Sequence, residues 1–450
     1  MKRKLVSVLC LAIVVTFLLG AQSVLACTPL GVGKDASADG SVMVSHTCDG
    51  WYDQRIIIIP GGEHVTVARH RDGYPRPDSF GRRHTRVQMK RVSGTDRSTL
   101  MRFAVVAALA VILVLLTFVL GTRKQVAIYG EQLDAVNRFE RMVSRLKQHR
   151  ADMAIPLDSE DYLETGLIGE SYTPLTTTIG DAGAKRTAST RDMAALVVRL
   201  LSEAGARSGD IVAANLSGSF PGLNLAFLAA CQTLDLKPVY TVSASASMYG
   251  ANIPGFSFPD MVLILHDAGY LDELPQSVSI GGDQDIGSEL DPGFCDELKV
   301  HLETSGLPFL YEPDFEQNIH ERLSLYEQFG SPELFVSIGG HTASLGVKKN
   351  AIMQMQGVIR PRYIQIDAES GLISRYLTSG VPVIQLLNIK RLTGDYGMVF
   401  DPPAMPPVGQ SAVYWENTYP LWLAAGGLIL IFAILVCFRL HASKQHRQGD

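Results

Sequence analysis

Residues 210–233 read DIVAANLSGSFPGLNLAFLAACQT, and this stretch decides the fold of most of the chain. The apolar run from Asp210 to Asn215 predicts a buried strand, and the apolar stretch from Gly222 to Thr233 predicts a helix. Small polar residues connect the two and offer hydroxyls and backbone N–H groups to an anion. The loop lacks both the Gly-Lys-Ser/Thr ending of a Walker loop and the glycine spacing of a dinucleotide site.

The same alternation of short apolar runs and helices continues along the chain. Further strands are predicted at 238–242, 261–265, 308–311, 334–338 and 381–386, and further helices at 192–204, 293–304 and 315–328. Alternation of this kind is typical of an α/β fold with a mostly parallel sheet and helices on both faces. The predicted α/β domain covers residues 151–418.

Ligands of an open α/β sheet bind at the carboxyl ends of its strands, so the candidate binding residues lie in the loops there. The loop after the first strand contributes Ser217 and Ser219. The tetrapeptide SIGG occurs at 279–282 and again at 337–340. Two such loops at equivalent strand ends are expected to face one cleft.

The residues after the two tetrapeptides complete the candidate site. Asp283 and Asp285 follow the first, and His341 follows the second. The alternative is that glycine turns close the strands and the polar residues only solvate them. The two carboxylates suit a hard cation but lack a third ligand. No Cys or His spacing suits zinc, no cofactor is expected, and no Gly-X-Ser-X-Gly elbow is present.

The composition indicates a membrane protein. The 450 residues are 46% hydrophobic and 19% charged, and the mean hydropathy is +0.13. The net charge of -5 gives no support for a nucleic-acid partner. Six Cys in this length exclude a small disulfide framework.

Three apolar segments punctuate the chain. Residues 1–26 have the basic start, apolar middle and Val-Leu-Ala end of a secretory signal peptide. Residues 103–120 and 421–438 are uncharged and long enough to be transmembrane helices. The alternative for the last two is a buried core helix. An amphipathic pattern at 122–150 predicts a helix that forms a stalk or packs against the domain.

The charges beside these segments conflict with the signal peptide. Basic residues precede 103–120 and form the tail at 439–450, so the positive-inside rule places both in the cytoplasm and the α/β domain outside. A secretory signal would place residues 27–102 outside and reverse both helices. The simplest interpretation is a fusion of two proteins, biological or an artefact of the gene model, with 69–102 as a basic junction.

The segment after the signal peptide carries a candidate nucleophile. Residues 27–55 read CTPLGVGKDASADGSVMVSHTCDGWYDQR, in which Asp-Gly between two apolar runs predicts a hairpin. Cleavage after Ala26 would give Cys27 a free α-amine, which can act as the base for its own thiol.

This segment, about 27–68, resembles the start of the C69 family of cysteine dipeptidases. The resemblance lies in the residues Cys27, Thr28, Val32, Gly33, Lys34, Ala36, Ser37, Asp39, Gly40, Ser41, His46, Thr47 and Asp49. It implies a four-layer αββα fold in which Cys27 attacks a peptide carbonyl and Asp49 helps order the site. That fold needs far more residues than this fragment supplies. A lipoprotein-type Cys at the cleavage site is the alternative.

The larger part, from about Met89 to the C-terminus, resembles the poly-gamma-glutamate system protein family. The resemblance lies in GDA at 180–182, NLSGSFP at 215–221, SASASMYGAN at 243–252 and SIGG at 279–282. It implies an α/β domain between two membrane anchors. The partners that it implies are poly-gamma-glutamate synthesis or export proteins, and the polymer or a gamma-glutamyl peptide. It implies no defined reaction.

These observations favour a membrane-anchored protein of a bacterial poly-gamma-glutamate system, with its α/β domain extracytoplasmic. Two enzymes remain as alternatives. One is a C69-type dipeptidase with Cys27 as nucleophile, and the other is a hydrolase that acts on gamma-glutamyl bonds through a serine loop of the α/β domain.

Overall fold

The computed structural model describes residues 27–32, 43–48, 97–348 and 350–447. The chain divides into two compact units. One is Thr122–Thr418, and the other combines Met1–Gly121 with Tyr419–Asp450. The predicted signal peptide at 1–26, most of the basic junction and Asp49 lie outside the described residues.

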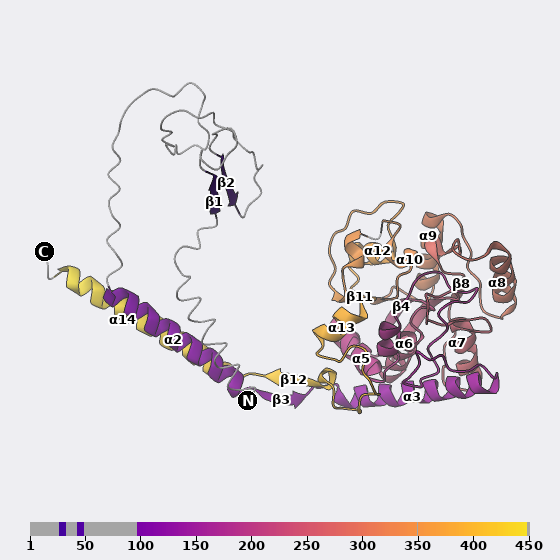
Figure 1. Ribbon diagram of the computed structural model, residues 1–450, viewed down its shortest axis with the longest axis horizontal. Coiled ribbons are helices and arrows are strands. Elements are labelled where there is room, and N and C mark those ends of the chain that lie inside the picture. The colour runs from indigo at the N-terminus through magenta and orange to yellow at the C-terminus, as the bar shows by residue number, and fades with distance from the viewer. Residues whose placement is uncertain (1–26, 33–42, 49–96, 349, 448–450) are drawn as a thin grey trace, which may run out of the picture. The chain divides into compact units, whose positions relative to one another are not determined.

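The larger unit is built on a six-stranded sheet in the order β10-β11-β9-β4-β5-β8 (Figure 1). Five strands are parallel, and the edge strand β10 runs antiparallel to β11. The strands are β4 (Ile211–Leu216), β5 (Lys237–Ser243), β8 (Ser277–Ser279), β9 (Leu334–Ile338), β10 (Gly357–Ile359) and β11 (Val383–Leu386). The predicted α/β fold with a mostly parallel sheet is confirmed.

Helices cover both faces of this sheet, because successive strand residues point to opposite sides. Val212 and Ala214 belong to one hydrophobic core, and Ala213 between them belongs to the other. The first core includes α5 (Asp192–Ala204), α6 (Pro221–Thr233), α7 (Phe258–Asp267) and α8 (Pro292–Thr304). The second includes α9 (Phe315–Glu327), α10 (Thr342–Leu345) and α12 (Leu372–Ser379).

Short elements complete the unit. The helices are α4 (Ala182–Ala188), α11 (Asn350–Met353) and α13 (Ile389–Asp395), with 3-10 turns η1 (Asp283–Asp285) and η2 (Ala412–Tyr414). The paired strands are β3 (Thr122–Gln125) with β12 (Trp415–Thr418), and β6 (Asn252–Ile253) with β7 (Phe256–Ser257). Both β3–β12 and β6–β7 are antiparallel.

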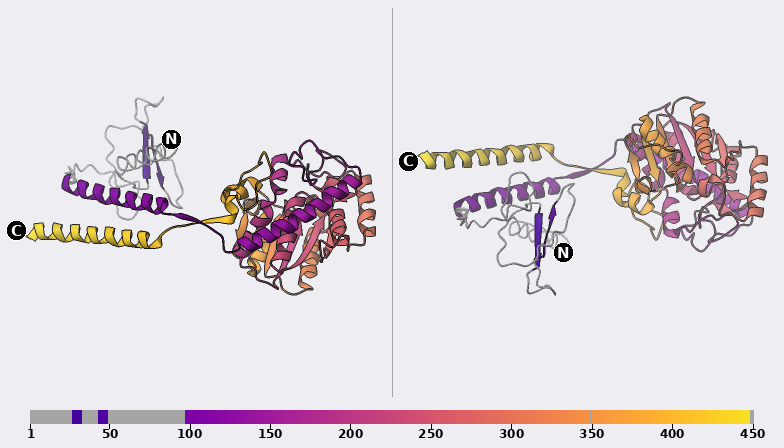
Figure 2. Two further views of the ribbon diagram at one scale, coloured as in Figure 1. Left: turned by 90° about the horizontal axis from the view of Figure 1, so that it is seen from below. Right: turned by 90° about the horizontal axis from the view of Figure 1, so that it is seen from above.

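The amphipathic segment predicted at 122–150 is a layer of the domain and not a stalk. Residues 122–125 form β3, and the helix α3 runs from Tyr129 to Asp152. Its apolar side, which includes Val136, Phe139 and Leu146, is fully buried. The helix packs on α5 and α6, and Figure 2 shows it lying across their outer side. Burial of this apolar stripe is what holds the helix against the domain.

Two of the predicted strands are wrong. The apolar run 261–265 belongs to α7, because Ser257 and Asp260 form a capping box that starts a helix at Phe258. Residues 308–311 pass beside β8 but make only one bridge, between Phe309 and Val278. Short apolar runs do not distinguish a strand from a helix by periodicity alone.

The other unit contains two apolar helices, α2 (Arg97–Val119) and α14 (Leu421–Arg447). Their segments Met101–Val119 and Leu421–Phe438 are long and apolar enough to cross a membrane, which supports membrane association. The helices pack antiparallel. Arg102 lies 5.7 Å from the centre of the Phe438 ring at one end, and the rings of Phe118 and Tyr419 are 5.5 Å apart at the other.

The N-terminal hairpin is present as two antiparallel strands. β1 spans Cys27–Val32 and β2 spans Met43–Cys48, with Cys27 opposite Cys48 in the register. Two strands do not establish a four-layer αββα fold, which stays a prediction.

Gly427 lies at the contact between α2 and α14. A Cβ atom at this position would lie 2.8 Å from Leu113 Cδ1, whereas a Cβ at Gly426 would meet nothing within 4 Å. Gly427→Leu should therefore push the helices apart, since close approach in membrane helix pairs needs small residues. We expect slower disulfide formation between cysteines placed at 118 and 419. The matched control is Gly426→Leu, and equal rates in the two variants would contradict this packing.

Candidate functional site

The candidate site lies where the order of the parallel strands reverses. From β4 the chain adds β5 and then β8 on one side, and it then crosses to place β9 on the other side of β4. In open α/β sheets, ligands bind at such a switch point, in a crevice at the carboxyl ends of the strands. We therefore take the region around the ends of β4 and β9 as the candidate site and call it the crevice. Ser217 follows β4 directly, and Gly339 follows β9.

A row of polar side chains crosses the sheet just below this edge. Residues in register on parallel strands point to the same face, and the row consists of Ser277, Thr241, Asn215, Ser337 and Gln385. Asn215 donates to Ser344 Oγ of α10 at 2.9 Å, so the row faces the side of α9 and α10. Interior strands of a parallel sheet are usually apolar on both faces. The polar row therefore distinguishes this edge from an ordinary sheet interior and makes it a candidate binding region.

A buried ion pair contacts the polar row on the side of α9. Arg322 of α9 donates to Asp285, and the two residues are only 1% and 4% exposed. Arg322 also donates to Asn215 Oδ1 at 2.8 Å. Burial works to lower the pKa of Arg322, but the carboxylate of Asp285 raises it, so the guanidinium stays charged.

The second oxygen of Asp285 is also occupied. It accepts hydrogen bonds from Ser279 Oγ at 2.8 Å and from the Gly281 N–H at 3.2 Å. Asp283 accepts from Thr342 Oγ1 at 2.8 Å, which joins the two SIGG loops as expected from the sequence. Asp285 therefore serves an ion pair in this structure, and a hard cation at Asp283 and Asp285 stays a prediction.

The serine loops meet in the crevice. Ser217 Oγ accepts from the Ser219 N–H at 3.1 Å, and Ser243 Oγ accepts from the Gly218 N–H at 3.2 Å. Gly339 has φ +94°, and a Cβ there would lie 2.5 Å from Ser217 Cβ. A glycine is therefore required for the β9 loop to pass Ser217.

His341 lies beside these serines. Its Nε2 is 3.4 Å from Ser243 Oγ. Burial, together with the nearby charge of Arg322, lowers the pKa of His341 to about 4, so the imidazole is neutral at pH 7. Its Nδ1 is buried, and the imidazole also interacts with the backbone of Leu216. A neutral imidazole carries one donor and one acceptor, so it can take part in binding either a hydroxyl or an amide.

A buried lysine adjoins the same loops, and sequence reasoning missed it. Lys185 of α4 is 3% exposed. Its Nζ donates to Ser247 Oγ at 2.7 Å and to the Ser219 carbonyl, and it lies 3.9 Å from the centre of the Phe220 ring. Burial lowers the pKa of Lys185 to about 7. The nearest sequence signal is GDA at 180–182, where Asp181 caps α4 through a hydrogen bond from the Ala184 N–H.

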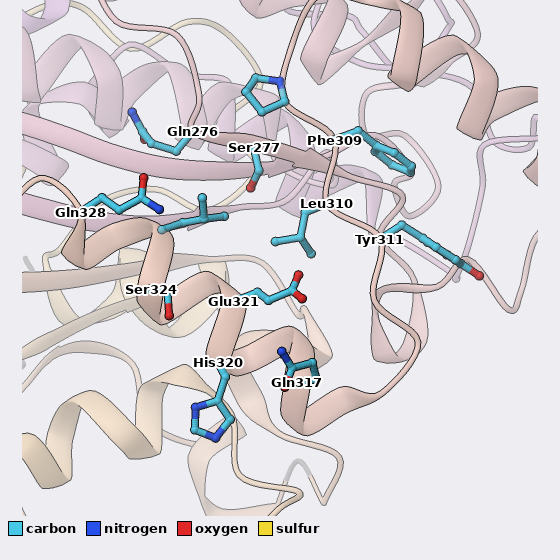
Figure 3. A pocket seen from close by; sticks show the side chains of 12 residues that line it. Gln276, Ser277, Phe309, Leu310, Tyr311, Gln317, His320, Glu321, Ser324 and Gln328 are labelled. Atoms are coloured by element: carbon cyan, nitrogen blue, oxygen red, sulfur yellow. The ribbon is translucent and has the colours of Figure 1, made fainter.

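A separate groove of about 450 Å³ lies between α9 and the segment beside β8 (Figure 3). Gln317, Glu321 and Ser324 of α9 line one side, and Ser277 and Leu310 line the other. None of the candidate binding residues predicted from the sequence lines this groove. The groove has room for a ligand, but the convergent polar groups and shifted pKa values lie in the crevice, which is therefore the better candidate.

The structure brings together Ser217, Ser219 and His341 in the crevice, and it places Asp283 and Asp285 at its rim and beneath it. Cys27 begins β1 in the other unit, and Asp49 lies outside the described residues. A role for Cys27 as nucleophile stays a prediction.

Comparison with known proteins gives no family assignment. No protein-family model matches the chain, and no curated protein is significantly similar to it.

The ion pair gives a stability prediction. Asp285→Asn keeps the shape of the side chain but leaves Arg322 charged and buried without compensation, so the free energy of unfolding should fall by about 3–5 kcal/mol. Chemical unfolding of the purified full chain measures this loss. The matched control is Asp296→Asn, which breaks an exposed pair with Lys299 and should cost no more than about 1 kcal/mol. Equal losses would contradict the role of the buried pair.

His341 gives a pH prediction. The unfolded chain protonates this side chain near its ordinary pKa of 6.5, whereas the folded protein does so only near pH 4. The unfolded state therefore binds more protons in this window, and the stability falls as the pH drops from about 6.5 to about 4. In His341→Gln this contribution should vanish. The measurement is the free energy of unfolding against pH for both proteins, and parallel curves would refute the assignment.

Proposed function

We propose that this chain is a membrane-anchored protein of a bacterial poly-gamma-glutamate synthesis or export system. Its α/β domain is extracytoplasmic and binds the polymer or a gamma-glutamyl peptide in the crevice at the carboxyl ends of β4 and β9. The observation that carries the proposal is the presence of two membrane-length helices on either side of one α/β domain in the sequence. The resemblance of the sequence to the poly-gamma-glutamate system family implies this layout.

The connections of the two helices support the topology. α2 leads into β3, α14 follows β12, and these strands pair with Thr122 opposite Thr418. The basic residues before 103 and after 438 therefore flank the ends of the two helices that are remote, along the chain, from this strand pair. The positive-inside rule assigns both basic flanks to the cytoplasm and the α/β domain to the outside.

The chemistry of the crevice suits a gamma-glutamyl group. Such a group carries a free carboxylate and an amide, so it needs both donors and acceptors from the protein. The hydroxyls of Ser217 and Ser243 and the neutral imidazole of His341 offer both. The crevice residues are small or neutral, while the charges of Asp285 and Arg322 compensate each other beneath them.

Binding and polymer export test the proposal together. Removal of a hydroxyl that bonds a charged ligand costs about 1.5–3 kcal/mol, so Ser217→Ala should weaken binding of a synthetic gamma-glutamyl oligomer at least about tenfold. In a producing host, loss of the gene should lower secreted polymer, and the variant should restore it poorly. The matched control is Ser208→Ala, which removes a hydroxyl bonded to the exposed Asp235. Unchanged secretion without the gene would refute the proposal.

A further inference from the structure

We propose that Ser247 and Lys185 form a nucleophile and general-base pair, with Ser219 beside them, that cleaves an acyl bond. The substrate class is an amide, and specifically a gamma-glutamyl amide if the function proposed above is correct. Ser247 lies in the loop after β5 and Lys185 lies on α4, and neither residue is among the candidate site residues predicted from the sequence.

The contacts of Lys185 have the geometry of a base. Its Nζ is 2.7 Å from Ser247 Oγ and also contacts the Ser219 carbonyl. A neutral amine can donate to the carbonyl while it accepts the proton of the hydroxyl. Within the described part of the chain, Lys185 forms no ion pair with a carboxylate, although Asp181 lies close enough to raise its pKa slightly against the larger effect of burial. Activation of serine by a nearby base is the general route to nucleophilic catalysis.

The backbone around Ser247 and Lys185 is closely packed, and glycines at two positions allow the loops to come near these side chains. A Cβ at Gly180 would lie 2.3 Å from the Met248 carbonyl oxygen and 3.3 Å from Lys185 Cε. A Cβ at Gly250 would lie 2.9 Å from Ser219 Cα. Tyr249 adopts φ +61°, a left-handed conformation that is strained for a bulky residue. Strain of this kind persists only where surrounding contacts enforce it, and it clusters at functional sites.

Ser219 supplies a hydrogen-bond donor for the negative oxygen of the intermediate. The Ser247 N–H donates to Ser219 Oγ at 2.9 Å, so the hydroxyl of Ser219 and this N–H lie together beside the nucleophile. Because this N–H is already committed to Ser219 Oγ, the Ser219 hydroxyl is the donor that can hold the negative oxygen of a tetrahedral intermediate. Ser219 and Tyr249 are partly exposed, while Ser247 is 8% exposed. The pair therefore lies just beneath the surface.

The reaction balances with water as the only co-reactant. Lys185 takes the proton of Ser247 as Oγ bonds to the acyl carbon. The C–N bond then breaks, and the leaving amine receives that proton from Lys185. Water attacks the resulting ester, Lys185 relays one proton to Ser247 Oγ, and a carboxylic acid leaves.

A fluorophosphonate probe tests the pair in the purified full chain without polymer or partner. The probe should label Ser247, as located by peptide mass, and Ser247→Ala should abolish that adduct. Lys185→Arg keeps a cation but cannot accept the proton, so labelling should slow by about a hundredfold or more. Ser245→Ala, a buried serine of the same loop, should leave the rate unchanged. Absence of an adduct on Ser247 in the folded protein overturns the proposal.

The pH profile of the wild-type chain is a second test that needs no variant. Labelling should rise with pH through a midpoint near 7, where Lys185 loses its proton. A rate that is flat from about pH 6 to about pH 9 overturns the role of Lys185 as the base. Hydrolysis of a gamma-glutamyl anilide then tests the substrate class. Labelling without hydrolysis would contradict that class and leave the nucleophile in place.

Discussion

The pairing of Arg322 with Asp285 holds the candidate site together. One guanidinium connects helix α9, the loop after β8 and the strand β4, through bonds to Asn318, Asp285 and Asn215. Burial of two charges costs several kcal/mol per ion, and only close pairing with further hydrogen bonds offsets that cost. The three elements therefore have one favourable arrangement, and the loops of the crevice are positioned by it.

The two faces of the sheet differ in polarity: one is apolar throughout, and the other becomes polar near the candidate site. The face under α5 and α6 is apolar along its whole length and supplies the larger hydrophobic core. The opposite face is apolar near the start of the strands, at Ala213 and Phe335, and becomes polar at Asn215 and Ser337. Burial of apolar area dominates the favourable free energy of folding, so the polar row near the crevice does not account for the stability of the fold. The polar row determines which groups line the candidate site.

Close backbone contacts bring the site loops together, and glycine permits them. The loop after β9 passes Ser217 at Gly339, and the loop after β5 closes on Ser219 at Gly250. The same closure places Ser247 beside Lys185, which belongs to a helix that precedes the sheet in the sequence. The crevice and the Ser247–Lys185 pair are thus neighbours that share Ser219.

The sequence by itself determined the elements with strong local signals. The helix 192–204 and the strand 334–338 have their predicted bounds, because their apolar patterns and flanking turn residues agree. The strand-end rule also located Ser217, Ser219 and His341, since loops at the carboxyl ends of parallel strands must meet. Only the tertiary structure decided that 261–265 is a helix, that α3 packs on the domain, and that Lys185 and Arg322 contact the loops of the candidate site. The partners of these two cations lie 62 and 37 residues away in the sequence. Local patterns contain no information on such pairs, because burial, which shifts the pKa of Lys185 and forces Arg322 to pair, exists only once the chain has folded.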